Sequence, residues 1–292
     1  MPALLIESQR VAHTVAHGTH GRRRAGPGET FWQFRHFDHN DARSGIDWRR
    51  SASSDHLFVR EREWEAAHTV WLWVDVSASM RFRSTLANIT KESRAVVLSL
   101  ALAELLARGG ERVGLFGRPP FTGRAAARRV AEVMMGDTSE ASLPPNAKLS
   151  RFSECLLFSD FLEPVADMAD RFEEIAAQGV RGHLIQVLDP AEETLPYAGR
   201  TEFASSEGRD RVIAGRAETL RERYRERLKH HRTDLIEVTR RLGWSFLVHH
   251  TDRPPEEAIL AIHTRLAGIE RDYRYRTPRQ RAGGEKAAGQ LP

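Results

Sequence analysis

The chain has 292 residues, of which 40% are apolar and 29% charged, and its net charge is +4. This length and composition are typical of a globular protein with one large domain, or one domain and an appended module, and exclude a wholly disordered chain. The sequence has neither a signal peptide pattern nor an apolar run near the roughly 18 residues that a transmembrane helix needs. The single cysteine, Cys155, excludes an internal disulfide, so we expect a cytoplasmic protein.

Basic residues gather in residues 22–24, 221–232 and 271–281. Such runs can contact nucleic acid or an anionic membrane, but they are also typical of solvated helix faces and tails. Glu222 and Glu226 interrupt the second run, which favours an exposed, salt-bridged helix. We therefore expect no nucleic-acid partner, while peripheral contact of the basic tail with a membrane stays open.

The two ends of the chain are expected to flank a central domain. Residues 1–29 contain glycine and arginine without a clear hydrophobic period and are expected to form an N-terminal arm. Residues 30–68 are dense in aromatic and charged residues, and the alternation over residues 57–65 predicts an extended β segment. Residues 268–292 are polar and basic, as is typical of a flexible tail.

Residues 69–267 alternate between strand-like and helix-like segments. A continuous apolar run such as Val70–Val74 predicts a strand buried on both faces. The expected strands are 70–74, 112–116, 155–158, 183–188 and 244–249, and the expected helices are 91–108, 125–135, 164–178, 217–242 and 255–266. Residues 189–215 are expected to form a hairpin or an irregular insert. The alternation predicts an α/β fold with a doubly wound, mostly parallel sheet of the Rossmann type, on which the N-terminal β segment packs.

Polar residues follow the first three expected strands. The first strand runs directly into Asp75-Val76-Ser77-Ala78-Ser79, the third ends on Asp160, and the loop after the second contains Thr122. The carboxyl ends of parallel strands form the functional edge of such a sheet. Hydroxyl and carboxylate oxygens suit Mg²⁺, and only two negative charges would leave the ion able to accept a carboxylate from a partner protein. The alternative is that Asp75 and Ser77 cap the next helix.

This arrangement resembles the metal-ion-dependent adhesion site of von Willebrand factor A domains, and the resemblance implies a von Willebrand factor A-like domain over residues 69–267. The resemblance implies that Mg²⁺, or else Mn²⁺ or Ca²⁺, is held by the side chains of Asp75, Ser77, Ser79, Thr122 and Asp160. Thr138 is a second candidate for the role of the threonine. The loop at Asp160 departs from the family pattern, because Phe161 stands where a glycine often follows the aspartate.

A second resemblance lies before the expected sheet. Four segments, Phe34–Asp38, Asp41–Arg43, Ile46–Ala52 and Val59–Glu61, are similar to the signature of the bacterial domain-of-unknown-function family 58. This resemblance implies a cytosolic or membrane-associated partner of MoxR-type AAA+ ATPases that acts in the assembly or maturation of other protein complexes.

The charged residues of this signature segment have two possible roles. They are expected to form ion pairs that dock one element on another, and a partner-docking surface is the alternative. Trp48 and Trp64 are expected to be core anchors.

Motifs of several enzyme classes are missing from the sequence. It has no Gly-x-x-x-x-Gly-Lys loop and no Gly-x-Ser-x-Gly elbow, and Ser77 stands where a haloacid dehalogenase-type phosphotransferase needs an aspartate. We therefore predict a non-enzymatic, metal-dependent protein-interaction module. The family resemblance implies that this module is an adaptor or assembly factor working with a MoxR-type AAA+ ATPase. The alternatives are a metal-dependent phosphoesterase or nuclease using Asp75, Asp160 and His249, and a scaffold whose site no longer holds metal.

Overall fold

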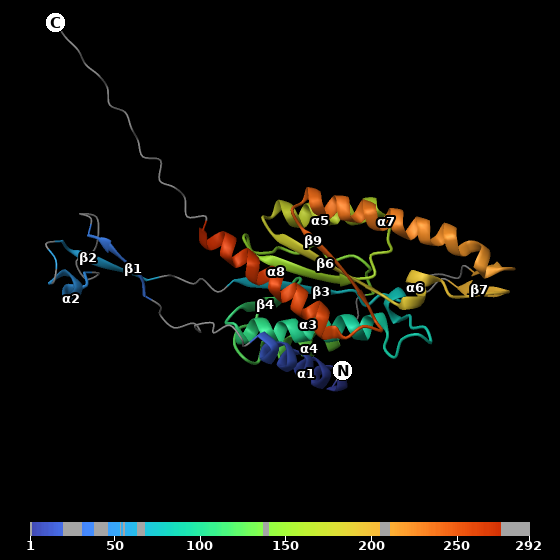
Figure 1. The fold of residues 1–292 in the computed structure, drawn as a ribbon, viewed down its shortest axis with the longest axis horizontal. Coiled ribbons are helices and arrows are strands. Elements are labelled where there is room, and N and C mark those ends of the chain that lie inside the picture. The colour runs from blue at the N-terminus through green and yellow to red at the C-terminus, as the bar shows by residue number, and fades with distance from the viewer. Residues whose placement is uncertain are drawn as a thin grey trace, which may run out of the picture.

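The computed structural model describes residues 2–19, 31–37, 46–52, 54, 56–62, 68–136, 140–204 and 211–275. Its centre is a sheet of five parallel strands in the order β4-β3-β5-β6-β9. The strands are β3 (Thr69–Val74), β4 (Arg112–Leu115), β5 (Glu154–Ser159), β6 (Arg181–Leu188) and β9 (Ser245–His250). Helices cover both faces of the sheet (Figure 1), so the predicted α/β, doubly wound parallel architecture is confirmed.

Strand β3 shows why the central strands are apolar along their whole length. Leu72 and Val74 belong to the core on one side of the sheet, and Trp71 and Trp73 belong to the core on the other side. This division follows because successive side chains of a strand point to opposite faces. All six residues of β3 are buried, as expected of a strand covered on both sides.

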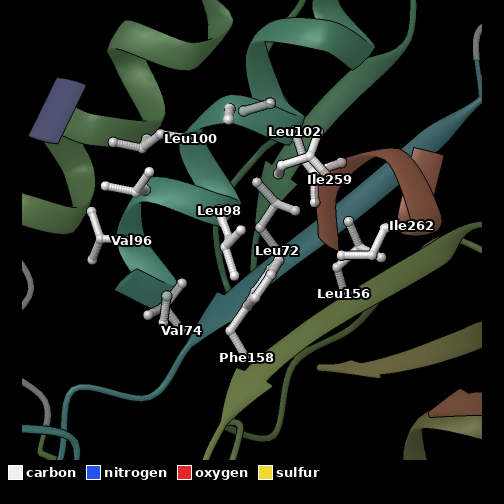
Figure 2. Packing of buried hydrophobic residues seen from close by; sticks show 14 of the residues in the cluster. Leu72, Val74, Val96, Leu98, Leu100, Leu102, Leu156, Phe158, Ile259 and Ile262 are labelled. Atoms are coloured by element: carbon white, nitrogen blue, oxygen red, sulfur yellow. The ribbon is translucent and has the colours of Figure 1, made fainter. Parts of the chain in front are cut away.

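Two helix layers enclose the sheet. On one side lie α1 (Pro2–Thr19), α3 (Lys91–Arg108), α4 (Ala126–Gly136) and α8 (Pro255–Tyr275), and on the other α5 (Val165–Ala177) and α7 (Arg221–Arg241). Figure 2 shows the packing of the first layer, in which Leu98 and Leu102 of α3 lie close to Leu72, Leu156 and Ile259. These side chains are almost completely buried, and they hold α3 and α8 against β3 and β5.

Residues 2–19 of the expected N-terminal arm form α1, which belongs to this core, and residues 20–29 lie outside the described residues. Val11, Ala12 and Val15 of α1 are buried and pack in the same cluster as α3. Leu4, Ser8, Val11 and Val15 recur at intervals of four, three and four residues, which is the period of one helix face. The glycines that follow obscured this period, because glycine disfavours helix interiors.

The signature segment forms a small unit of β1 (Phe31–His36), α2 (Trp48–Ser51) and β2 (Phe58–Arg62). Strands β1 and β2 pair antiparallel with each other, and within the described residues neither joins the five-stranded sheet. Figure 1 shows this unit at the left of the view, well apart from the five-stranded sheet. Trp48 is 64% exposed, so its predicted role as a core anchor is wrong, and Trp64 lies outside the described residues.

The chain between β6 and α7 forms an insert. It consists of α6 (Pro190–Thr194), the antiparallel strands β7 (Thr201–Ala204) and β8 (Arg211–Ala214), and the short 3-10 helix η3 (Ala217–Leu220). The hairpin expected within residues 189–215 is therefore present. Helix α8 continues to Tyr275, past the predicted end of the domain at residue 267. Among the helices in the described part of the chain, none is long and apolar enough to cross a membrane.

Candidate functional site

The candidate site lies where the strand order of the sheet reverses. From β3 the chain first reaches its neighbour β4, and it then returns to β5 on the opposite side of β3. In a doubly wound sheet such a reversal opens a crevice at the carboxyl ends of the two central strands. Asp75 follows β3 and Asp160 follows β5, and the Asp75 amide donates to the carbonyl oxygen of Phe158 at 2.9 Å. The fold thus brings the two aspartates to one edge.

Asp75 is buried and holds the turn that follows β3. Its Oδ1 accepts a hydrogen bond from the Ser77 amide at 2.8 Å, and its Oδ2 accepts one from the Ser159 hydroxyl at 2.6 Å. Burial raises the pKa of Asp75 to about 6, although both serines act to lower it. The next turn, η2 (Ser79–Arg81), has no side-chain cap, and Thr90 caps α3. The alternative reading of Asp75 and Ser77 as helix caps is therefore wrong.

A chain of oxygen atoms links the two serines to Asp160. The hydroxyl oxygens of Ser77 and Ser79 lie 3.2 Å apart, and the Ser79 hydroxyl donates to Asp160 Oδ2 at 2.8 Å. The backbone of Asp160 is fixed in turn, because its carbonyl oxygen accepts a hydrogen bond from the Gln186 side chain at 2.8 Å. Four of the five predicted site residues, Asp75, Ser77, Ser79 and Asp160, are thus brought together.

Thr122 is not part of this group, which corrects the expected set of ligands. After β4 the chain turns back at Gly117, whose φ is 72°, and Phe121 then pairs antiparallel with Val113 near the start of that strand. Thr122 therefore lies toward the amino ends of the strands, where its side chain is exposed, whereas Asp75 lies beyond the carboxyl ends.

A different loop reaches the turn that carries Ser79. Arg81, the last residue of η2, forms an ion pair with Glu140 at 2.6 Å, and Glu140 belongs to the loop after α4. Thr138, the second candidate for the role of the threonine, lies outside the described residues. Within the described part, the loop after α4 rather than the loop after β4 therefore borders the site.

The backbone at Phe161 shows how the turn after Asp160 forms without a glycine. Phe161 has a φ of 49°, in the left-handed region that glycine adopts readily and other residues rarely. A backbone of this kind costs about 1 kcal/mol in a residue with a side chain. Phe161 is held there because its ring is buried beside that of Phe172, and because its amide donates to the Ser159 hydroxyl oxygen at 3.0 Å. The loop thus keeps the glycine-like turn without the glycine.

Lys91, which the sequence analysis missed, places a positive charge in the site. It is the first residue of α3 and 1% exposed, and its Nζ donates to Asp160 Oδ2 at 2.8 Å and to Glu192 Oε1 at 2.5 Å. Burial acts to lower the pKa of Lys91, but the carboxylates of Asp160 and Glu192 outweigh it, and the pKa lies above its ordinary value. Positive charge is unfavourable at a helix N-terminus, so a lysine there was a signal that carboxylates lie nearby.

Glu192 and Asp189 connect this charge to the loop before α3. The Asp189 amide donates to Glu192 Oε2 at 2.8 Å, which closes a capping box at the start of α6. Asp189 Oδ2 in turn accepts a hydrogen bond from the Ser84 amide at 2.8 Å. With Lys91 bound between Asp160 and Glu192, the formal charge of these three groups is −1, because two carboxylates share one ammonium.

Exposed apolar side chains lie on the two loops next to the polar cluster. Phe82 follows η2 and is 37% exposed, and its ring centre lies 5.8 Å from Lys91 Nζ. Leu86 in the same loop and Leu162 after β5 are 50% and 41% exposed, and the Leu162 amide donates to Asp160 Oδ1 at 3.3 Å. Phe82 and Leu162 are thus partly exposed apolar residues that contact residues of the polar cluster.

His249, which the enzyme alternative invoked, lies on β9, two strands away from β5. This places it roughly 10 Å from the end of β5, because neighbouring strands lie about 4.8 Å apart. Burial lowers the pKa of His249 to about 3, with smaller contributions from Arg94 and His250. Its Nε2 has no hydrogen-bond partner in the described part of the chain. No observation therefore connects His249 with the Asp75 cluster or favours the phosphoesterase or nuclease alternative.

Two oxygen–oxygen separations in the cluster match both a hydrogen bond and the spacing of neighbouring ligands around a divalent cation. Mg²⁺ binds six oxygens at about 2.0–2.1 Å, so neighbouring ligands of its octahedron lie about 3 Å apart. The separations from Ser77 to Ser79 and from Ser79 to Asp160 are 3.2 and 2.8 Å. Over the described ranges, no group of three or more histidine, cysteine, aspartate and glutamate side chains could hold a metal. An ion at this edge would therefore depend on the serine hydroxyls.

Comparison with known proteins identifies the family of the chain. It belongs to the family described as "Protein of unknown function DUF58", whose model matches residues 33–234, and this confirms the resemblance seen in the signature segment. Uncharacterized proteins of Mycobacterium bovis and Mycobacterium tuberculosis are 28% identical to it over 263 residues, which cover 82% of this chain and 80% of theirs.

Two solved structures have a similar chain path. One is an aerotolerance-related membrane protein from Bacteroides fragilis, with a TM-score of 0.43, and the other is a conserved hypothetical protein, BatB, from Bacteroides thetaiotaomicron, with a TM-score of 0.36. Each is 13% identical to this chain, and each alignment covers 69% of this chain and 100% of the other. Structural similarity with TM-scores this low supports no conclusion about the function of this chain.

Proposed function

We propose that this member of the DUF58 family is a non-catalytic protein-interaction module that captures its partner through a divalent cation. In this proposal Ser77, Ser79 and Asp160 bind Mg²⁺, or else Mn²⁺ or Ca²⁺, and Asp75 orients the loop or binds the ion through water. The observation that supports it most directly is the run of three oxygen atoms at separations of 3.2 and 2.8 Å where the strand order reverses.

The ligand set determines what such an ion would attract. Two of the three oxygen atoms come from neutral serine hydroxyls, and the third belongs to Asp160, whose charge Lys91 already shares. A cation held in this way keeps much of its positive charge and completes its coordination with further oxygen atoms. A carboxylate of a partner protein would supply such an oxygen atom together with the missing negative charge.

The border of the site supports a protein as the partner. Phe82, Leu86 and Leu162 together offer exposed apolar surface on the loops that carry the polar cluster. A partner that places an acidic side chain on the ion could bury these three side chains at the same time, and burial of apolar surface contributes roughly 25 cal/mol per Å². The class of partner, a MoxR-type AAA+ ATPase, comes from the family resemblance, and the proposal includes a cytoplasmic setting where such an ATPase finds ATP.

Capture experiments with a purified MoxR-type ATPase test this function. The wild-type chain should retain the ATPase in millimolar Mg²⁺ and release it in EDTA. Asp75→Ala should abolish both Mg²⁺ binding and capture, because the buried carboxylate fixes Ser77 through its amide. Asp170→Ala is the matched control, since Asp170 is exposed on α5 and is not part of the Asp75 cluster.

Ser77→Ala and Ser79→Ala separate loss of the ligand from loss of the fold. Both variants leave the Asp75 carboxylate in place and remove one hydroxyl each, so they should fold and still lose capture. Capture of equal strength in EDTA would contradict the metal-dependent function. Turnover of a phosphoester substrate that disappears in Asp160→Ala would contradict the non-catalytic assignment.

A further inference from the structure

Lys91 already provides a cation at the proposed ion site. Its Nζ lies 2.8 Å from the Oδ2 atom of Asp160 that also accepts the Ser79 hydroxyl at 2.8 Å. The side chain of Lys91 is buried, and the loop that carries Phe82 is joined to it, since the Lys91 amide donates to the Phe82 carbonyl oxygen at 3.3 Å. The ammonium is therefore a fixed part of the site and not a surface charge that happens to be near.

The ammonium and a divalent cation would use the same oxygen atom. Asp160 Oδ2 already accepts two hydrogen bonds, one from Ser79 and one from Lys91. A divalent cation bound to Ser79 and to Asp160 Oδ2 would lie close to the ammonium, and like charges at such a distance repel strongly in a partly buried site. Binding of the ion and the contact between Lys91 and Asp160 therefore oppose each other.

The structure offers the ammonium a second acceptor. Glu192 Oε1 lies 2.5 Å from Lys91 Nζ, and Glu192 is held in position because its Oε2 accepts the Asp189 amide at 2.8 Å. A small movement of the flexible Lys91 side chain would therefore break its ion pair with Asp160 and keep its ion pair with Glu192. Without Glu192, the ammonium would lose its remaining negative partner in a buried place, which is costly.

We propose that Lys91 is an internal cation that competes with the divalent ion for Asp160 and so sets the ion affinity of the site, moving toward Glu192 when the ion binds. This inference rests on the proposed function, because it concerns the regulation of the same site. Lys91 and Glu192 thus have opposite effects on the ion affinity of the site. Lys91 weakens ion binding, and Glu192 assists it by holding the displaced ammonium.

Calorimetric titration with Mg²⁺ and Mn²⁺ of two variants tests the proposal. Lys91→Met keeps an unbranched apolar chain of similar shape and removes the ammonium group, so the dissociation constant should fall by about tenfold or more. Glu192→Gln removes the second acceptor and should raise the dissociation constant by about the same factor. Lys229→Met is the matched control, because Lys229 is exposed on α7, and it should leave the affinity unchanged.

The wild-type chain allows a second measurement that needs no substitution. It contains four lysines, Lys91, Lys148, Lys229 and Lys286, so a sample labelled with ¹⁵N-lysine gives few ammonium signals. The Lys91 ammonium signal should shift in step with Mg²⁺ binding, while those of the exposed Lys148 and Lys229 stay in place. If Lys91→Met does not fold, the double variant Lys91→Met/Glu192→Gln, which removes one charge of each sign, takes its place in the titration.

The results distinguish this inference from the proposed function. If the wild-type chain binds no ion at millimolar concentrations and Lys91→Met does, the competition is supported and metal dependence of the natural chain fails. If both bind with equal affinity and the Lys91 signal does not move, the competition is overturned and the proposed function stands. If neither binds an ion, both are overturned.

Discussion

Replacing His249 with leucine should make the stability of this protein less sensitive to acid. Burial, followed by the nearby charges of Arg94 and His250, lowers the pKa of His249 from 6.5 to about 3 in the folded chain. The unfolded chain takes up a proton near the ordinary value, and the folded chain does not until the pH is far lower. The contribution of His249 to stability is therefore fully present above about pH 6.5 and is lost as the pH falls toward 3.

The size of this effect follows from the two pKa values. One pKa unit corresponds to about 1.4 kcal/mol, so a difference between 6.5 and about 3 amounts to about 5 kcal/mol over the full range. Marginal stabilities of about 5–15 kcal/mol are typical of domains, so this is a large share. Leucine removes the titration, and it forfeits no hydrogen bond at Nε2, because that atom has no partner in the described part of the chain.

Urea denaturation followed by tryptophan fluorescence at several pH values measures the effect. The free energy of unfolding of the wild-type chain should fall more between pH 7 and pH 4 than that of His249→Leu. His230→Leu is the matched control, because His230 is exposed on α7 and should leave the acid sensitivity as it is. An equal loss of stability in the wild-type chain and in His249→Leu would show that the pKa of His249 is not lowered in the folded chain.

Three further substitutions test the packing and the support of the site by the same denaturation assay. Ser159→Ala removes one of the hydrogen bonds to the buried carboxylate of Asp75 and should cost about 2 kcal/mol; no loss would show that the bond is not formed. Gly182→Ala should cost about 3 kcal/mol, because a Cβ atom would lie 2.1 Å from the ring of Trp244, and an unchanged midpoint would contradict that contact. Val11→Ala should cost about 2 kcal/mol if α1 is part of the core, whereas an arm would tolerate it.

The sheet and the two aspartates could be predicted because their signals are local. The run Val70–Val74 is apolar at every position, which is what a strand covered on both faces requires, and the structure buries all of it. The carboxyl ends of parallel strands meet at one edge, so the positions of Asp75 and Asp160 followed from the order of elements. Ser77 and Ser79 follow Asp75 so closely in the sequence that a single turn after β3 brings all three side chains to this edge.

The remaining features depend on how distant segments meet. Thr122 was misplaced because the chain turns back at Gly117, and a loop sequence does not show in which direction the loop leaves a strand. Lys91 was missed because its partners, Asp160 and Glu192, lie far along the chain and come together only through β5 and α6. Trp48 was expected to be a core anchor, but it lies in the single turn of α2 and is 64% exposed.

In the proposed function, the hydroxyl and carboxylate oxygens at the carboxyl ends of β3 and β5 hold a divalent cation. Titration of Mg²⁺ into the ¹⁵N-labelled wild-type chain and its Ser77→Ala/Ser79→Ala variant tests this binding. We expect saturable shifts of backbone amide signals from residues 75–82 and 159–162 in the wild-type chain, and none of them in the variant. Shifts that persist in the variant, or a wild-type spectrum that millimolar Mg²⁺ leaves unchanged, would contradict it.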